Sequence, residues 1–167
     1  MPIINPAELD LKEEAVVRIN RVAKVTSRGK RFSFSTIVVV GDGMGHVGMG
    51  LGKANEVISS ISKAKDKAKR NIFKSTIING TIPHKIVGRY GASRVLLKPA
   101  APGTGIIAGA PVRAVMEQVG VKNILTKRYG SSNPMNIVRA AINALENLQD
   151  AVKIANKRGI KIKDVFT

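Results

Sequence analysis

The sequence contains no cysteine and no tryptophan, and aromatic residues make up only 4% of its 167 residues. The absence of cysteine excludes disulfides, thiolate nucleophiles and cysteine-ligated zinc fingers. The scarcity of aromatic side chains argues against base stacking as the main mode of RNA binding and against anchoring at a membrane surface. No apolar run approaches the roughly 20 residues that cross a bilayer. We therefore expect stability to come from core packing in a reducing, cytosolic setting.

The first 20 residues also lack a continuous apolar run. They carry four acidic residues instead, namely Glu8, Asp10, Glu13 and Glu14. We expect neither a signal peptide nor a transit sequence in this segment.

Acidic residues are few in the chain as a whole. There are 11 Asp and Glu and 28 Lys and Arg, which gives a net charge of +17. A polyanion relieves the self-repulsion of such a charge by pairing and by counterion release. No carboxylate pair has the spacing of a two-metal nuclease, and His46 and His84 are isolated in the sequence. We expect a nucleic acid as partner and no catalytic site, metal site, cofactor, small-molecule substrate or membrane partner.

Residues 1–80 are expected to form the first of two small α/β-type domains in an α+β protein, with a core from about residue 15. Residues 15–40 alternate like strands around a hairpin loop at residues 26–30, and a third short strand follows residues 41–43. From Asn55 the apolar period becomes that of a helix, with Val57, Ile58, Ile61, Ala64, Ala68 and Ile72 on one side. The other side is expected to carry a basic stripe of Lys63, Lys67, Arg70 and Lys74.

Residues 81–150 are expected to form the second domain. Strands at 85–90, 93–98 and 122–129 surround a glycine-rich loop at 102–110 and a helix that begins at Pro111 and ends at Gly120. Asn133 is a typical N-cap for the last helix of this domain. Residues 151–167 are expected to form a basic, weakly ordered tail. The chain has no low-complexity linker, so we expect the two domains to pack closely.

Gly43-x-Gly45-x-x-Gly48 formally matches the dinucleotide-binding fingerprint. The match falls between two expected strands rather than at a strand-to-helix turn, and no acidic residue follows about 20 positions later. A nucleotide site is therefore not expected.

The alternating glycines at 48, 50 and 52 are expected to let RNA phosphates approach the backbone, with Lys53 at the helix start. The loop at 102–110 leaves two alternatives open. One is a phosphate site at a helix N-terminus, and the other is a plain packing turn.

Basic residues concentrate in the first domain, where thirteen bases and only three acids lie between Arg18 and Lys74. Three strands followed by a basic helix are typical of double-stranded RNA modules, which contact phosphates and 2′-hydroxyls. The expected RNA contacts are Arg18, Arg21, Lys24, Ser27, Arg28, Gly29, Lys30, Arg31, Lys53, Lys63, Lys67, Arg70, Arg94, Arg113, Lys127 and Arg128.

Three segments together resemble one known family. GKRFSFSTIVVVGDGMGHVGMGLGKANEV (29–57), PGTGIIAGAPVRAVMEQVGV (102–121) and YGSSNPMNIVRA (129–140) resemble, in this order, conserved segments of the universal small-subunit ribosomal protein five family. The resemblance runs from about Val17 to Leu148. It implies an N-terminal domain like a double-stranded-RNA-binding fold and a C-terminal βαβ sandwich shared with some kinases and translocases, without implying their activity.

The resemblance further implies a structural role in the small ribosomal subunit of the cytoplasm. Members of the family bind small-subunit rRNA, support subunit assembly and decoding accuracy, pack against small-subunit ribosomal proteins four and eight, and lie near the mRNA entry channel. The loop at 25–30 matches the family loop that approaches the spectinomycin site, which implicates Lys24, Arg28 and Lys30 there. Members often carry two adjacent glycines in this loop, whereas this chain has Arg28 followed by Gly29.

Two other functions are kept as alternatives. A free-standing double-stranded RNA-binding protein would bind generic duplexes outside ribosomes. A nucleotide-dependent kinase, suggested by the second domain and the glycine loops, would have to bind ATP.

Overall fold

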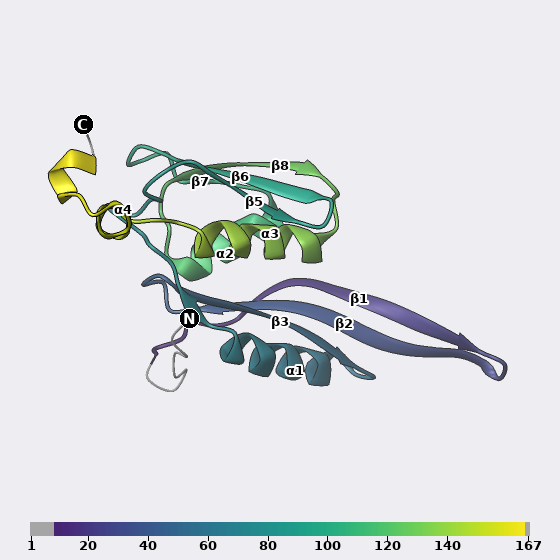
Figure 1. The fold of residues 1–167 in the computed structure, drawn as a ribbon. Helices are drawn as coiled ribbons and strands as arrows, with labels where there is room; N and C mark the ends of the chain where they lie inside the picture. Colours follow the sequence, from purple (N-terminus) through teal and green to yellow (C-terminus); the bar gives the residue numbers. More distant parts are fainter. Residues whose placement is uncertain (1–8, 166–167) are drawn as a thin grey trace.

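The computed structural model describes residues 9–165, which form two domains stacked in alternating layers. In Figure 1 the C-terminal sheet, helices α2 and α3, the N-terminal sheet and helix α1 follow one another. The predicted α+β class is confirmed. The elements are β1 (Ala15–Thr26), β2 (Gly29–Gly41), β3 (His46–Ala54), α1 (Val57–Arg70), β4 (Phe73–Lys74), β5 (Ile86–Tyr90), β6 (Ser93–Pro99), β7 (Ile106–Ile107), α2 (Ala110–Val119), β8 (Ile124–Gly130), α3 (Pro134–Glu146), α4 (Ala151–Arg158) and the short 3-10 helix η2 (Ile162–Val165).

The N-terminal sheet has the antiparallel order β1-β2-β3-β4, with α1 against one face. The glycines of β3 let the helix approach closely, because a Cβ on Gly50 would lie 1.9 Å from the Ala64 carbonyl oxygen, and one on Gly52 1.9 Å from that of Ser60. Both glycines are buried. The prediction that RNA phosphates approach this backbone is therefore wrong, since the helix occupies the space.

Helix α1 buries a narrower stripe than the sequence predicted. Ser60, Ala64 and Ala68 are buried, whereas Ile58 is 82% exposed. The close approach explains this, because small residues fit against glycines and larger ones are displaced to the sides. The basic stripe is also shorter than predicted, since the helix ends at Arg70 and Lys74 belongs to β4.

Strands β1 and β2 form a long hairpin whose far half extends beyond α1 (Figure 1). Thr26 pairs with Gly29, so Ser27 and Arg28 alone make the turn. Gly29 has a φ of +115°, and Arg28 is not among the residues with positive φ. One glycine therefore suffices for this turn. The predicted alternation holds for most of β1, although a bulge between Val16 and Arg18 removes Val17 from it.

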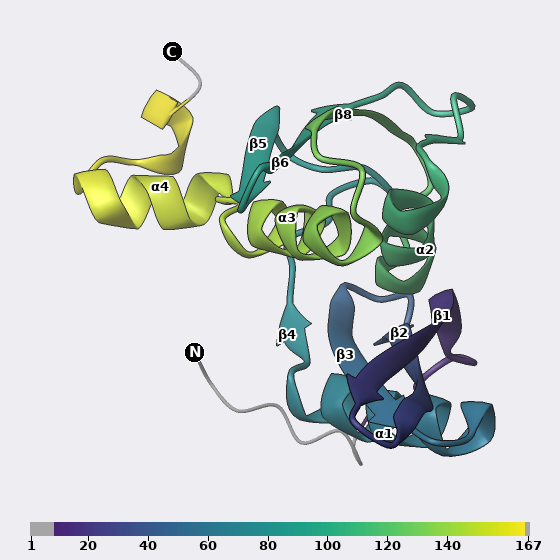
Figure 2. The same ribbon diagram turned by 90° about the vertical axis from the view of Figure 1, so that its right-hand side faces the viewer.

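The C-terminal sheet has the order β5-β6-β8-β7, in which only β7 runs parallel to its neighbour. Helices α2 and α3 cover the same face of this sheet (Figures 1 and 2). Gly88 permits the contact with α3, because a Cβ there would lie 1.9 Å from the Ala140 carbonyl oxygen. The predicted helix ends are confirmed: Gly120 closes α2 with a φ of +89°, and the Asn133 side chain accepts a hydrogen bond from the Met135 N–H.

The larger of two apolar clusters runs through both domains, which confirms the predicted close packing, and the smaller one lies between the N-terminal sheet and α1. The larger cluster joins Val39 and Val47 of the N-terminal sheet to Val115 and Val119 of α2, all of them fully buried. The turn between β2 and β3 adds backbone hydrogen bonds, from Gly43 N–H to the Gln118 carbonyl and from Gly45 N–H to the Val119 carbonyl. The two domains therefore present their surfaces in a fixed relation.

The segment after Asp150 departs from the predicted tail, because residues 151–158 form helix α4. The Asp150 side chain accepts a hydrogen bond from the Ala151 N–H at 2.7 Å, and Gly159 closes the helix with a φ of +66°. Residues 1–8, with Glu8, and residues 166–167 lie outside the described residues. None of the helices within residues 9–165 is long and apolar enough to cross a membrane.

Candidate nucleic-acid interface

All sixteen predicted contact residues are exposed, but the structure distributes them over several surfaces. Ten lie on the β1–β2 hairpin and the adjoining ends of β3 and α1. Lys67 and Arg70 lie further along α1, and the remaining four lie on the C-terminal domain. The hairpin region therefore holds the largest group.

A basic hollow of about 360 Å³ lies where the hairpin meets the start of α1. We call its four cations, Lys24, Arg31, Lys53 and Lys63, the ribbon cluster. Lys24 and Arg31 are paired directly across the two strands, an arrangement that destabilises a sheet when no anion lies between the charges. Among residues 9–165 only Glu14–Lys65 and Asp42–His46 form ion pairs. The cluster is thus available to a phosphate.

The rest of the hairpin carries cations on both faces. Arg18 lies on the face of Lys24 and donates a hydrogen bond to Asn20 at 3.0 Å. Arg21 lies on the opposite face, its guanidinium carbon 4.0 Å from the centre of the Phe32 ring. A free two-stranded ribbon is at best marginally stable in water. An anionic partner in contact with both faces would stabilise this one.

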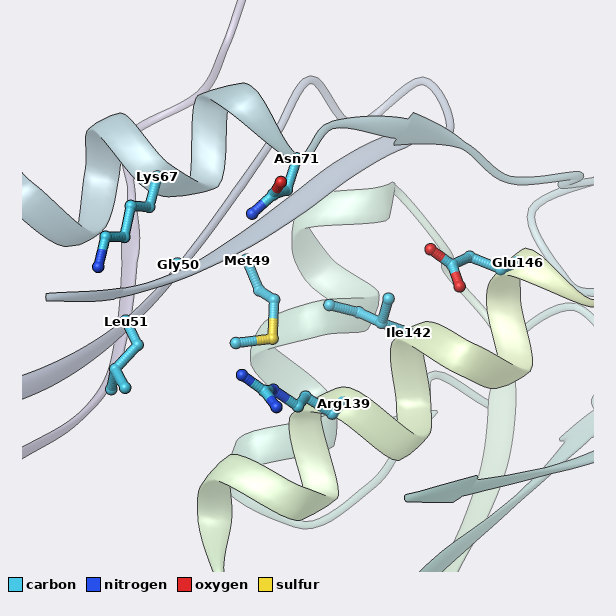
Figure 3. Close-up of a pocket in the computed structure, with 8 residues that line it drawn as sticks. All are labelled: Met49, Gly50, Leu51, Lys67, Asn71, Arg139, Ile142 and Glu146. Carbon is cyan, nitrogen blue, oxygen red and sulfur yellow. The ribbon is translucent and has the colours of Figure 1, made fainter. Parts of the chain in front are cut away.

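A groove of about 330 Å³ separates the two domains at the free edge of β3. Figure 3 shows Lys67 on the α1 side of it and Arg139 and Glu146 on the α3 side. The Arg139 guanidinium carbon lies 4.8 Å from the ring centre of Tyr90, whose hydroxyl accepts a hydrogen bond from it. Burial raises the pKa of the Glu146 carboxyl. Lys67 therefore lines a different hollow from that of the ribbon cluster, one helical turn beyond Lys63, and Arg70 occupies the last turn of α1.

The four predicted contacts on the C-terminal domain are divided between two sides. Arg94 and Lys127 point away from the helices, on the face of the sheet that no helix covers. Arg113 donates a hydrogen bond to the Ile106 carbonyl at 2.9 Å, and Arg128 lines a small hollow beside Gly109 at the start of α2, which Lys127 also lines.

The glycine motifs do not form a phosphate loop. Gly43 and Gly45 lie in a hairpin, as predicted, and their N–H groups are hydrogen-bonded to α2. In the loop at 102–110 the N–H groups of Gly103 and Gly105 donate to the Asn123 side chain at 3.0 and 3.1 Å, which favours the packing turn. Within residues 9–165 no group of three or more His, Asp or Glu could hold a metal ion.

Asp42 stabilises the turn between β2 and β3, which packs against α2 of the C-terminal domain. Its carboxylate accepts hydrogen bonds from the N–H groups of Met44 at 2.7 Å and His46 at 3.0 Å, and contacts the His46 ring at 2.5 Å. Burial tends to raise the pKa of this carboxyl, but the hydrogen bonds outweigh burial and hold the pKa below its ordinary value of 3.8.

We expect Asp42→Asn to lower the free energy of unfolding by roughly 1–3 kcal/mol at neutral pH, because hydrogen bonds to a charged group are lost. Since the folded state favours the carboxylate, this contribution is present above the ordinary pKa and disappears as the pH falls through the lowered one. Urea titrations should show that the difference in free energy of unfolding between the wild type and Asp42→Asn disappears below a pH of about 4. Asp66→Asn, at an exposed position of α1, should show no such difference. A difference that stayed constant into strong acid would contradict the assignment.

Two packed α+β domains, with exposed cations on several faces that form no ion pair within residues 9–165, define a strongly basic two-domain α+β protein. The family profiles identify it further. Residues 12–74 match the N-terminal domain of ribosomal protein S5, and residues 88–158 match its C-terminal domain. The chain belongs to the ribosomal protein S5 family, which confirms the resemblance found in the sequence.

Curated relatives agree over nearly the whole chain. The protein named small ribosomal subunit protein uS5 from Salinibacter ruber is 56% identical over 92% of this chain and 87% of its own length. The protein of the same name from Chloroflexus aurantiacus is 52% identical over 98% and 91%, and that from Thermotoga maritima is 54% identical over 92% and 86%.

Proposed function

We propose that this protein is a structural constituent of the small ribosomal subunit that binds small-subunit rRNA. The observation that carries the proposal is the ribbon cluster, in which four exposed cations surround a hollow and none forms an ion pair with an acidic residue of the described part of the chain. The family supports it, because relatives that align over most of their length are named as small-subunit proteins. The role requires neither catalysis nor a cofactor.

Binding depends on phosphate neutralisation by a rigid platform. Lysine and arginine contacts to phosphates position a protein on RNA, and the release of counterions supplies much of the affinity. The core that joins the two domains holds the base of the hairpin, at Ile37 and Val39, in a fixed position relative to the C-terminal domain. One molecule can thus contact separate RNA segments and hold them together during subunit assembly.

The finer role follows from the resemblance. We infer that the protein supports decoding accuracy near the mRNA entry region, packs against small-subunit proteins four and eight, and works in the cytoplasm. The hairpin tip at Ser27–Gly29 would lie near the spectinomycin site. Arg28 adds a cation at this tip while Gly29 alone supplies the positive φ, so the turn remains compatible with that position.

Sedimentation of a gentle lysate through a sucrose gradient tests the proposal. We expect the protein to migrate stoichiometrically with the small subunit and to remain bound after a wash at moderate salt. A protein that stays at the top of the gradient would contradict the proposal. Generic duplex RNA and ATP would then be tested, for the free-standing RNA-binding protein and the kinase respectively.

A further inference from the structure

The C-terminal sheet leaves one face uncovered. Helices α2 and α3 both lie between the two sheets, and within residues 9–165 no helix lies over the opposite face (Figures 1 and 2). A sheet face in this position is normally either polar and solvated or occupied by a partner. The side chains on it decide between these two possibilities.

Strand register identifies those side chains. Gly88 faces α3, so its neighbours Val87 and Arg89 point to the uncovered side. Arg89 pairs with Arg94, and Arg94 with Tyr129 on the next strand. By the same alternation the uncovered side, called here the open face, consists of Val87, Arg89, Arg94, Leu96, Lys98, Ile107, Leu125, Lys127 and Tyr129.

The open face carries four exposed cations, Arg89, Arg94, Lys98 and Lys127, and no acidic residue. Scattered exposed cations are often merely solvated. The pairing of Arg89 directly opposite Arg94 is different, because like charges at such positions destabilise a sheet. Neither arginine takes part in an ion pair among the described residues. A bound anion between the two guanidinium groups would remove the repulsion.

Tyr129 adds a second feature that favours RNA over a simple anion. The residue is 50% exposed, and it neighbours Arg94 in the same row of the sheet. Exposed aromatic rings on open sheets are typical stacking positions for bases of single-stranded RNA. Because this is a single ring, phosphate contacts must supply most of the affinity.

We propose that the open face binds a strand of RNA, with phosphates on the Arg89–Arg94 pair and on Lys127, and with one base stacked on Tyr129. The inference rests on the proposed function and deepens it, because it adds an RNA surface separated from the ribbon cluster by the layer of α2 and α3. The excess of positive charge favours RNA over a basic ribosomal protein as occupant. An acidic protein segment is the competing occupant.

The test compares full-length Arg89→Gln/Arg94→Gln with the wild type in filter binding to small-subunit rRNA over a series of KCl concentrations. Loss of two phosphate contacts should weaken binding about tenfold or more and lower the slope of log K against log salt by about 1.4. Lys157→Gln/Arg158→Gln removes the same charge from exposed positions of α4. This control should keep the wild-type slope.

Tyr129→Leu separates stacking from charge. We expect it to weaken rRNA binding about tenfold with an unchanged salt slope. The Arg94→Gln single variant should raise the melting temperature of the RNA-free protein by about 1–3 °C, because the cross-strand repulsion is relieved. A lower melting temperature would mean that the arginine has a structural role, and would overturn the assignment.

Failure of this inference is distinguishable from failure of the proposed function. If the wild type binds rRNA and sediments with the small subunit while the arginine pair variant keeps the wild-type slope, the open face does not bind RNA. If that variant keeps full rRNA affinity but is lost from subunits reconstituted with all their proteins, an acidic protein segment occupies the face and the inference is overturned. A wild type that binds no rRNA would overturn both.

Discussion

Gly50→Ala is expected to lower the free energy of unfolding by about 3 kcal/mol, near the upper end for overpacked cores. The added Cβ would lie 1.9 Å from the Ala64 carbonyl oxygen and 2.6 Å from the Ala68 nitrogen. Both are backbone atoms of α1, so no side-chain rotation can make room. Helix α1 would have to move away from β3 and give up the packing of its buried stripe.

Urea-induced unfolding of the full-length protein, followed by circular dichroism, measures this effect. Gly109→Ala is a matched control, because Gly109 has a φ of −68° and nothing lies within 4 Å of the position that the added methyl group would take. The control should change the free energy of unfolding by no more than about 0.5 kcal/mol, as expected for a surface position. Equal stability of the two variants would show that α1 does not require the glycine at position 50.

Replacement of three ribbon-cluster cations by glutamine, at Lys24, Arg31 and Lys53, is expected to weaken binding to small-subunit rRNA about a hundredfold or more. If each contacts one phosphate, the slope of log K against log salt should fall by about 2–3. The variant should fold at least as well as the wild type, because the repulsion between Lys24 and Arg31 is removed. Filter binding over a series of KCl concentrations measures both affinity and slope.

The control for this variant removes three charges from α4, at Lys153, Lys157 and Arg158, all of which are exposed. We expect it to retain most of the wild-type affinity and the wild-type slope. If the ribbon-cluster variant and the α4 variant lost affinity equally, general charge rather than a defined site would hold the RNA. The ribbon cluster would then have no special role in the proposed function.

Much of the fold was predictable from the sequence because local signals agreed with one another. Asn133 before Pro134 predicted the start of α3, and Gly120 predicted the end of α2. Such signals act within a few residues, through hydrogen bonds of the helix ends. Three family-like segments in the right order then identified the family.

The glycines of β3 show where local reasoning failed. Every second residue from Gly48 to Gly52 lacks a side chain, and from the sequence this pattern favoured a backbone open to phosphates. Helix α1 occupies this space instead. Which group fills it depends on where a helix further along the chain packs. Ile58 was misplaced for the same reason, since the close approach of the helix narrowed its buried stripe.

The sequence by itself determined most of the elements, the charge and the family, because propensity, periodicity and motif order are properties of neighbouring residues. Only the tertiary structure decided which cations lie together. Lys24 and Arg31 meet because β1 pairs with β2, and Arg89 meets Arg94 because β5 pairs with β6 in one particular register. A shift of one residue would send these side chains to opposite faces. Register and layer order, which are set by long-range packing, therefore define the surfaces that RNA can meet.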